Sequence, residues 1–236
     1  MLALPSAEIS MLSISATNEW RVAHPGAAIG LLELSRIEKA PTPTRLDDRK
    51  RETEAHLRQR YQGLTRQDFS SLPVMSAYVR YYKRFGKTYH VQLQVESIVS
   101  KGKSLPNVTP LVDANFVAEV ETLVLTAGHD VAKLHGAVSI DVSRDGDQMT
   151  QMSGPLKPLL AGDMIMRDDK GVCCSIIYGQ DDRSAISPET SHVLYVAYAP
   201  AGVPAEAVDA QLRKIEGNVR LFSPAVVVEQ HRVLSA

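Results

Sequence analysis

A block of helix-like segments is followed in this chain by a block of strand-like segments, and the change comes at Gly136. Up to residue 124 the apolar positions recur mostly with a helical period, and the expected helices are 42–62, 74–85, 91–102 and 109–124. After Gly136 the apolar runs are short and bounded by Gly, Asp or Pro, and the expected strands are 137–143, 163–169, 172–179 and 192–199. A strand at 27–37, a helix at 204–218 and a strand at 225–230 complete the pattern. The chain is therefore predicted to be an α+β protein.

The composition fits one globular domain spanning 1–236. Hydrophobic residues make up 44% and charged residues 22% of the chain, and no repeat or low-complexity linker divides it. No apolar run approaches the ~20 residues that a membrane helix needs. The first ten residues have no basic residue ahead of their apolar positions and contain Pro5, which argues against a secretory signal. We therefore expect a cytoplasmic protein without membrane contact.

The sequence contains no complete motif for a common cofactor or metal site. Cys173 and Cys174 are adjacent, so in a strand they point to opposite faces, and no histidine stands at a usable spacing for zinc. The stretch Gly102-Lys103-Ser104 resembles the end of a phosphate-binding loop, but Ser97 replaces the required glycine and a helix precedes it. Neither a G-x-S-x-G elbow nor an H-E-x-x-H motif occurs. No cofactor and no metal are expected.

The charge of the chain is uneven, although its net value is only −1. From Arg45 to Lys103 there are thirteen Lys or Arg against six Asp or Glu, a local charge of +7, and the rest of the chain carries −8. Residues 44–60 mix both signs, which is typical of a solvated helix. Residues 78–87 contain no acid, and aromatic residues alternate there with four cations: Arg80, Lys83, Arg84 and Lys87. This pattern suits RNA, through phosphate neutralisation and base stacking, and equally an amphipathic helix with an aromatic core face.

The segment SLPNVTPLVDANF, residues 104–116, holds more turn-forming and polar residues than a connector between two helices needs. Pro110 fits an early helical position, where its missing N–H costs little. Asp113 and Asn115 follow it. Taken by themselves, these two residues are explained by a capping or turn role.

Four stretches of the chain stand in an order that resembles a known family: 81–87, 100–123, 127–136 and 176–196. Over about residues 76–200 they resemble the tRNA-binding and editing domain of the phenylalanyl-tRNA synthetase β subunit, and most closely its free-standing relatives. The family's Asn-x-Val-Asp-Val-Thr-Asn run corresponds to Asn107 with Asp113 and Asn115. Its Asp-Leu-x-Lys-Leu step, glycine turn and later Glu-Thr pair correspond to 130–134 (followed by Gly136), Gly179 and Glu189-Thr190.

The resemblance implies a mostly antiparallel, barrel-like sheet flanked by helices. It also implies binding of RNA, with tRNA as the expected partner, and hydrolysis of a mischarged aminoacyl ester. Such chemistry needs a held water and donors for an oxyanion, which backbone N–H groups near Gly179 would supply, with His129 as the candidate to hold the water or the ribose hydroxyl. The residues expected to bind the amino-acid moiety are Asp113, Asn115, Asp130, Asp181, Asp182 and Thr190. The residues expected to contact RNA are Arg80, Lys83, Arg84 and Lys87.

Two departures from the family pattern bear on catalysis. Leu125-Thr126-Ala127 stands where the family has Pro-x-His, and Gly179, preceded by Tyr178, replaces a glycine pair. His129 lies two residues after the missing histidine and equally fits a helix-start role beside Asp130. An aminoacylation core is absent from this sequence, so charging of tRNA is not expected. The alternative function is a non-catalytic module that binds an amino acid or a related small ligand.

Overall fold

The computed structural model describes residues 12–39, 44–152 and 154–236. Its α-helices are α1 (Asn18–Ala23), α2 (Thr44–Arg60), α3 (Arg66–Ser71), α4 (Pro73–Lys83), α5 (His90–Lys101), α6 (Pro110–Thr122) and α7 (Ala205–Arg220), with a short 3-10 helix at Val131–Lys133. Its strands are β1 (Ile14–Ala16), β2 (Ala28–Ser35), β3 (Thr126–Asp130), β4 (Val138–Val142), β5 (Gln148–Thr150), β6 (Leu156–Pro158), β7 (Met164–Asp168), β8 (Gly171–Ser175), β9 (Gly179–Gln180), β10 (Val193–Ala199) and β11 (Val227–Ser235). None of the helices described here is long and apolar enough to cross a membrane.

The strands form two larger sheets and a small hairpin. One sheet has the order β11-β2-β10-β3 and is antiparallel throughout, and the other has the order β1-β4-β7-β8-β9, in which only β1 and β4 are parallel. The predicted α+β class and the mostly antiparallel pairing are confirmed. Each larger sheet keeps two edge strands, so the strands described here close no barrel, and the barrel-like detail stays unconfirmed.

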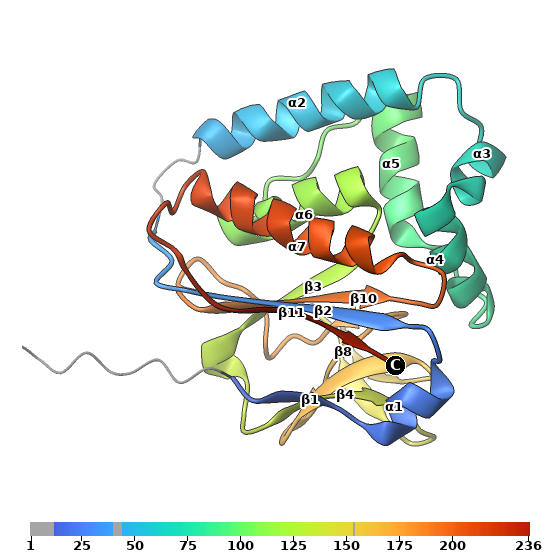
Figure 1. The fold of residues 1–236 in the computed structure, drawn as a ribbon, viewed down its shortest axis with the longest axis vertical. Coiled ribbons are helices and arrows are strands. Elements are labelled where there is room, and N and C mark those ends of the chain that lie inside the picture. Colours follow the sequence, from blue (N-terminus) through green and yellow to red (C-terminus); the bar gives the residue numbers. More distant parts are fainter. Residues whose placement is uncertain (1–11, 40–43, 153) are drawn as a thin grey trace, which may run out of the picture.

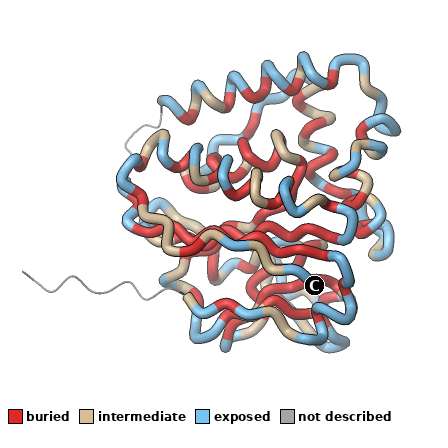
Figure 2. The backbone as a smooth tube through the Cα atoms, viewed as in Figure 1, coloured by how far each residue is buried: buried red, intermediate tan, exposed pale blue. Residues whose placement is uncertain are grey.

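The four-stranded sheet lies in the middle of the molecule. Helices α6 and α7 pack against one of its faces with α2 outside them, and the five-stranded sheet covers the other face (Figure 1). Helices therefore cover one side of this sheet rather than both. Every residue of β2 and β10 is buried, because these two central strands are covered on both faces (Figure 2). This double burial explains their uninterrupted apolar sequences.

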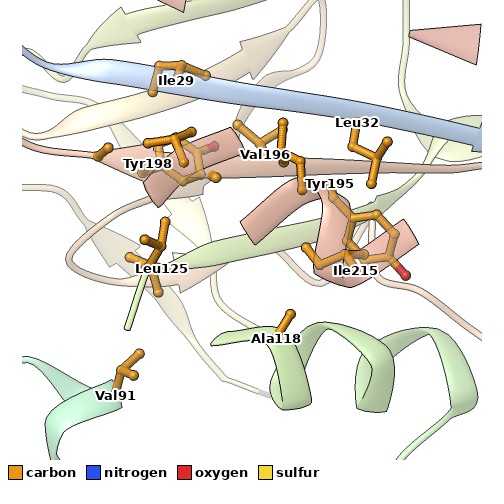
Figure 3. Close-up of a cluster of buried hydrophobic side chains, with 14 of the residues drawn as sticks. Ile29, Leu32, Val91, Ala118, Leu125, Tyr195, Val196, Tyr198 and Ile215 are labelled. Carbon is orange, nitrogen blue, oxygen red and sulfur yellow. The ribbon is translucent and has the colours of Figure 1, made fainter. Parts of the chain in front are cut away.

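The core is built from large apolar side chains of both the central strands and the helices. Figure 3 shows Tyr195, Val196 and Tyr198 of β10 among apolar side chains of β2, α5, α6 and α7. Gly30 of β2 lies directly beneath α7, where an added Cβ would come within 2.6 Å of Cγ1 of Val208. Glycine at this position lets the helix approach the sheet closely.

The predicted helices correspond to α2, α4, α5, α6 and α7, with ends shifted by a few residues. Residues 42 and 43, predicted to begin the first helix, lie outside the described residues. The helix expected over 109–124 ends earlier, because Leu123 adopts a left-handed conformation with φ of 65° and closes α6. The chain then enters β3, an edge strand that the sequence pattern did not predict. This tight turn places α6 beside β3.

Candidate functional site

A cavity of about 160 Å³ lies between α6, the edge strand β3 and the β8–β9 turn. Most of its wall is apolar, and Leu125, Tyr195 and Tyr198 of Figure 3 belong to it. Its polar or charged lining residues are His90, Asn115, Glu119, Thr126, Ser175 and Gln180. An apolar cavity with a few convergent polar groups is typical of a small-ligand site.

Glu119 is the most unusual of the lining residues. Its side chain is 2% exposed and accepts a hydrogen bond from the backbone N–H of Thr126 at 3.0 Å. No basic side chain of the described segments forms an ion pair with it. Burial disfavours the charged form, and it raises the pKa of Glu119 from 4.5 to about 8. A carboxyl group with its pKa near neutrality can take up or release a proton during a reaction.

Asn115 stands one helical turn before Glu119 on α6 and lines the same cavity. Its Nδ2 donates to the carbonyl of Thr126 at 2.9 Å, and its Oδ1 accepts from Gln211 Nε2 at 3.4 Å. Gln211 also donates to Thr126 Oγ1 at 2.9 Å. Asn115 thus ties α6 to β3 and α7 in the cavity wall.

The edge of β3 away from β10 adjoins the cavity, and part of it is closed by an antiparallel bridge between His129 and Ala185. Tyr198 N donates to Leu125 O and Val131 N donates to His192 O, so the odd-numbered residues of this segment exchange hydrogen bonds with β10. The backbone groups of Thr126, Gly128 and Asp130 therefore point away from β10. Those of Thr126 are bonded to Glu119 and Asn115, whereas Gly128 lines the cavity.

Gly179 also lines the cavity, as the first residue of β9 directly after the turn from β8. Its φ of +84° favours glycine, and an added Cβ would meet no atom within 4 Å. The preceding residue, Tyr178, has Lys87 Nζ and Lys157 Nζ each 5.9 Å from its ring centroid. Asn115 and Gly179, predicted to converge on one cleft, are thus brought together, and basic side chains lie beside the Gly179 wall.

Ser175 connects the cavity to the interior of the molecule. Its hydroxyl forms a short hydrogen bond with Oδ2 of Asp163, and Tyr81 OH donates to Oδ1 of the same residue at 2.7 Å. Burial raises the pKa of Asp163 to about 6. The three side chains join α4 to the five-stranded sheet behind the cavity.

His129 is fully buried and does not belong to the cavity lining. Its Nδ1 lies 2.7 Å from Ser184 Oγ, and Ser184 in turn is hydrogen-bonded to Asp181 through both its N–H and its hydroxyl. Burial, and secondarily Arg183, lowers the pKa of His129 to about 3. The ring is therefore neutral near pH 7 and braces the 181–184 turn against β3.

The other residues predicted to bind the amino acid lie outside the cavity lining. Asp113 forms a buried ion pair with Lys50 of α2 at 2.9 Å, and Lys50 also contacts Pro106 O at 2.6 Å and Asn107 Oδ1. Asp130 accepts a hydrogen bond from Thr190 Oγ1 at 2.8 Å. Asp182 is exposed in the loop after β9. Two polar residues of 104–116, Asn107 and Asp113, therefore bind Lys50 of α2.

The four cations predicted to contact RNA lie on one exposed strip. Arg80, Lys83 and Arg84 follow α4 to its C-cap, Lys87 lies in the next turn, and all four are exposed. None of them forms an ion pair with an acid of the described segments. The helix is amphipathic, because Tyr78, Tyr81 and Tyr82 are buried on its opposite face. The hydroxyls of these tyrosines are hydrogen-bonded in the core, so the rings are not available for base stacking.

Sequence reasoning missed Glu119, although a signal was present. Glu119 lies four residues after Asn115 in an otherwise apolar stretch, VAEV, and a charged residue among apolar helical positions is a candidate for a buried ionisable group. Both cysteines are free and buried, as expected from their adjacency. The described residues hold no cluster of three or more His, Cys, Asp or Glu arranged to bind a metal ion.

Comparisons with known proteins bear on the same region. No curated protein matches the sequence. A solved structure of an N-terminal fragment of the phenylalanyl-tRNA synthetase β-subunit from Pyrococcus horikoshii has 7% sequence identity and a TM-score of 0.47, and the alignment covers 96% of this chain and 55% of that one. This chain thus spans about half the length of that fragment.

Residues 76–217 match the B3/4 domain. The match includes the predicted core of about 76–200 and continues through most of α7. It contains the cavity and the basic strip of α4. That residues 1–236 form a single domain stays a prediction. The resemblance suggested by the sequence motifs is confirmed: the chain belongs to the B3/4 domain family, the family of the phenylalanyl-tRNA synthetase β-subunit domain.

Proposed function

We propose that this protein binds tRNA along the basic strip of α4 and hydrolyses the ester of a mischarged aminoacyl-tRNA in the cavity beside β3. Membership of the B3/4 family supports a tRNA-related role. The proposed substrate is an aminoacyl-tRNA made elsewhere, since the chain is not expected to charge tRNA. The proposed compartment is the cytoplasm.

The proposal depends most on one juxtaposition. The cavity holds a buried carboxyl group, Glu119, and its Gly179 wall adjoins Tyr178, which lies beside Lys87 at the end of the basic strip. A polyanion on the strip would be led toward the cavity, because exposed cations without acidic partners attract phosphates. The aminoacyl end of the same molecule would then enter among apolar side chains.

The proposed chemistry uses no covalent intermediate. Glu119, in its ionised form, takes a proton from a water molecule as that water attacks the ester carbonyl carbon. The carbonyl oxygen becomes an oxyanion, and backbone N–H groups at Gly128 and near Gly179 donate hydrogen bonds to it. The carbon–oxygen bond to the ribose then breaks, and the ribose oxygen takes up the proton from Glu119. The products are a free amino acid and an uncharged tRNA.

The buried network around the cavity has a positioning role in this proposal. Asn115 holds the carbonyl of Thr126, while His129 with Asp181 braces the turn that follows Gly179. Asp130 and Thr190 fix the far end of β3. We assign the base to Glu119 rather than to His129 because Glu119 lines the cavity.

The test is single-turnover release of amino acid from a panel of mischarged tRNAs, compared with the same esters in buffer. We expect faster release with at least one ester, without metal and without an acyl-enzyme. Gly179→Val is expected to abolish turnover, because its φ of +84° is strained for a branched residue and the side chain alters the cavity wall. Binding of uncharged tRNA by this variant should be retained.

Absence of release with every ester would contradict the hydrolytic role. If the protein then still bound an amino acid or tRNA, the non-catalytic alternative would replace it. The substitution of Leu125-Thr126-Ala127 for the family's Pro-x-His favours this second candidate. Equilibrium dialysis with free amino acids separates the two candidates, since the binding module should retain its ligand without turnover.

A further inference from the structure

A second cavity, of about 220 Å³, lies beside α4. Its wall is formed by α4, by the connection between α1 and β2, and by the turn after β10. The side chains of His24, Arg80, Tyr81 and Arg84 line it. Two guanidinium groups and an imidazole thus converge on one recess, and no carboxylate belongs to the lining.

His24 supplies a buried polar atom without a partner. The residue is 5% exposed, and its Nε2 has no hydrogen-bond partner within the described part of the chain. The ring lies with its centroid 6.0 Å from that of Tyr81. Burial, followed by the nearby Arg84, lowers the pKa of His24 to about 4, so the imidazole is neutral near pH 7. An orphaned buried nitrogen in a cavity wall is costly unless a ligand or water satisfies it.

Both arginines are exposed, and each guanidinium group also has contacts within the fold. Arg80 Nη1 donates to Ser76 Oγ at 3.0 Å, and its Nη2 lies so near Gly202 that an added Cβ there would come within 2.7 Å. The guanidinium of Arg84 stacks over Tyr81 and Phe85, 5.5 and 5.6 Å from their ring centroids. Neither arginine forms an ion pair with an acid in the described segments. Their positive charge is therefore available to an anion.

We propose that this recess is a binding site for a single phosphate group, held by Arg80 and Arg84 and by a hydrogen bond from Nε2 of His24. Two guanidinium groups and a neutral N–H donor match the several acceptor oxygens of a phosphate. The site shares Arg80 and Arg84 with the basic strip and adds the buried donor of His24, so it can select an anion by shape as well as by charge. It rests on the proposed tRNA binding only for the source of the phosphate.

The first experiment uses inorganic phosphate as the probe. Backbone amide NMR shifts of Ala201 and Gly202, in the cavity wall and beside Arg80, are followed during titration at constant ionic strength near pH 7. Saturable shifts with phosphate, and none with the same ionic strength of chloride, are the expected result. Linear, non-saturating shifts with both salts would overturn the proposal.

Matched variants separate a built site from general attraction. Arg84→Gln and His24→Phe should each weaken phosphate binding by about tenfold, since each removes a donor to a charged oxygen. Lys83→Ala, on the same helix but outside the cavity, should leave it unchanged. His24→Phe keeps an aromatic ring against Tyr81 and removes the nitrogen that lacks a partner. Should this variant fail to fold, Arg84→Gln provides the same test, because Arg84 is exposed. Equal weakening by Lys83→Ala would reject the site.

Two further probes identify the source of the phosphate. Adenosine 5′-monophosphate presents a phosphomonoester, and a short RNA with a 5′-hydroxyl presents only phosphodiesters. Competition by the nucleotide alone would assign the site to a free or terminal phosphate, and competition by the RNA would assign it to the nucleic-acid backbone. Saturable phosphate binding without ester hydrolysis would leave this site standing while the proposed activity fails. Ester hydrolysis without saturable phosphate binding would reject this site and leave the proposed activity standing.

Discussion

The cavity beside β3 and the basic strip of α4 use charge in opposite ways. In the cavity a single carboxyl group, Glu119, is enclosed by apolar walls, and burial raises its pKa to about 8. On α4 four cations are exposed, and no acid of the described residues pairs with them. A buried charge can take part in proton transfer because its ionisation is finely balanced, whereas exposed charges can only attract and orient a partner. The difference supports the proposal of chemistry in the first region and of recognition in the second.

After the loss of turnover expected for Gly179→Val, the largest effect is expected from Glu119→Gln. This change keeps the size of the side chain and removes the proton acceptor, so turnover of a mischarged ester should fall on the order of a hundredfold. In the unmodified protein, kcat/KM above the buffer background should rise with pH, reach half of its plateau near pH 8, the pKa of Glu119, and level off above that pH. Rapid-quench assays across this pH range provide the measurement.

Glu121→Gln is the matched control for this change. Glu121 lies on the same helix but contacts Lys214 and Thr53 instead of the cavity. Replacing the carboxyl group of Glu121 by an amide should leave the pH profile of turnover unaltered. A profile that keeps its rise in Glu119→Gln and loses it in Glu121→Gln would reverse the assignment.

The second prediction concerns how the free energy of unfolding changes with pH. Between about pH 4.5 and 8 the carboxyl of Glu119 is protonated in the folded protein and ionised in the unfolded chain. The free energy of unfolding therefore falls as pH rises through this interval. Between about pH 6.5 and 8 the contribution of Glu119 should fall by about 1.6 kcal/mol. The groups with lowered pKa, such as His24 and His129, and Asp163 with its pKa of about 6, change stability below this window.

Urea unfolding at several pH values measures this slope. Glu119→Gln should flatten it, because no titrating group remains at the position. Glu121→Gln should keep it: burial alone would raise the pKa of Glu121, but its hydrogen bonds with Lys214 and Thr53 lower it, so its contribution is lost only in acid. A slope that persists in Glu119→Gln would show that the carboxyl is ionised in the folded state.

A smaller effect is expected on the basic strip. The double variant Lys83→Ala/Arg84→Ala should weaken binding to different tRNAs alike and reduce the slope of log K against log salt by about 1 to 2, since each neutralised phosphate contributes about 0.7 to 0.9. Lys101→Ala/Lys103→Ala, which removes two exposed cations at the end of α5, is the control. Equal slopes for the two double variants would exclude α4 as the RNA surface.

The smallest effect on turnover is expected from His129→Ala. The ring is enclosed and bonded to Ser184, so its removal should destabilise the 181–184 turn and leave the rate per folded molecule nearly unchanged. Turnover normalised to the folded fraction tests this. A loss on the order of a hundredfold would instead identify His129 as the base.

The arrangement of elements was largely predictable from the sequence, because period and turn residues are local properties. The helical runs and the β-rich region after Gly136 both appear where expected. The edge strand β3 was missed because Thr126–Asp130 is too short and too polar to show a period, and it depends on pairing with β10 for its structure. The barrel-like detail was inferred from the resemblance alone, because sheet closure cannot be predicted from local patterns.

The candidate site was harder to predict than the fold. Asn115 and Gly179 both line the cavity. Asp113, a similar residue two positions before Asn115, instead faces Lys50, because a shift of two residues along a helix places a side chain on another face. Glu119 was overlooked because burial, not residue type, gives it its unusual pKa. The cations of α4 were found because their clustering is visible in composition.

The edge of β3 away from β10, which is partly closed by the bridge between His129 and Ala185, also limits what can occupy the cavity. An open sheet edge usually offers a row of backbone groups to which an extended peptide can add as a further strand. Here Asn115 and Glu119 already occupy the groups of Thr126, and Ser184 O accepts from Asp130 N at 2.9 Å, so Gly128 lies between two closed positions. One residue is too short a ladder for strand addition or for edge-to-edge association of two copies. The cavity is therefore suited to a compact end group rather than to a polypeptide segment.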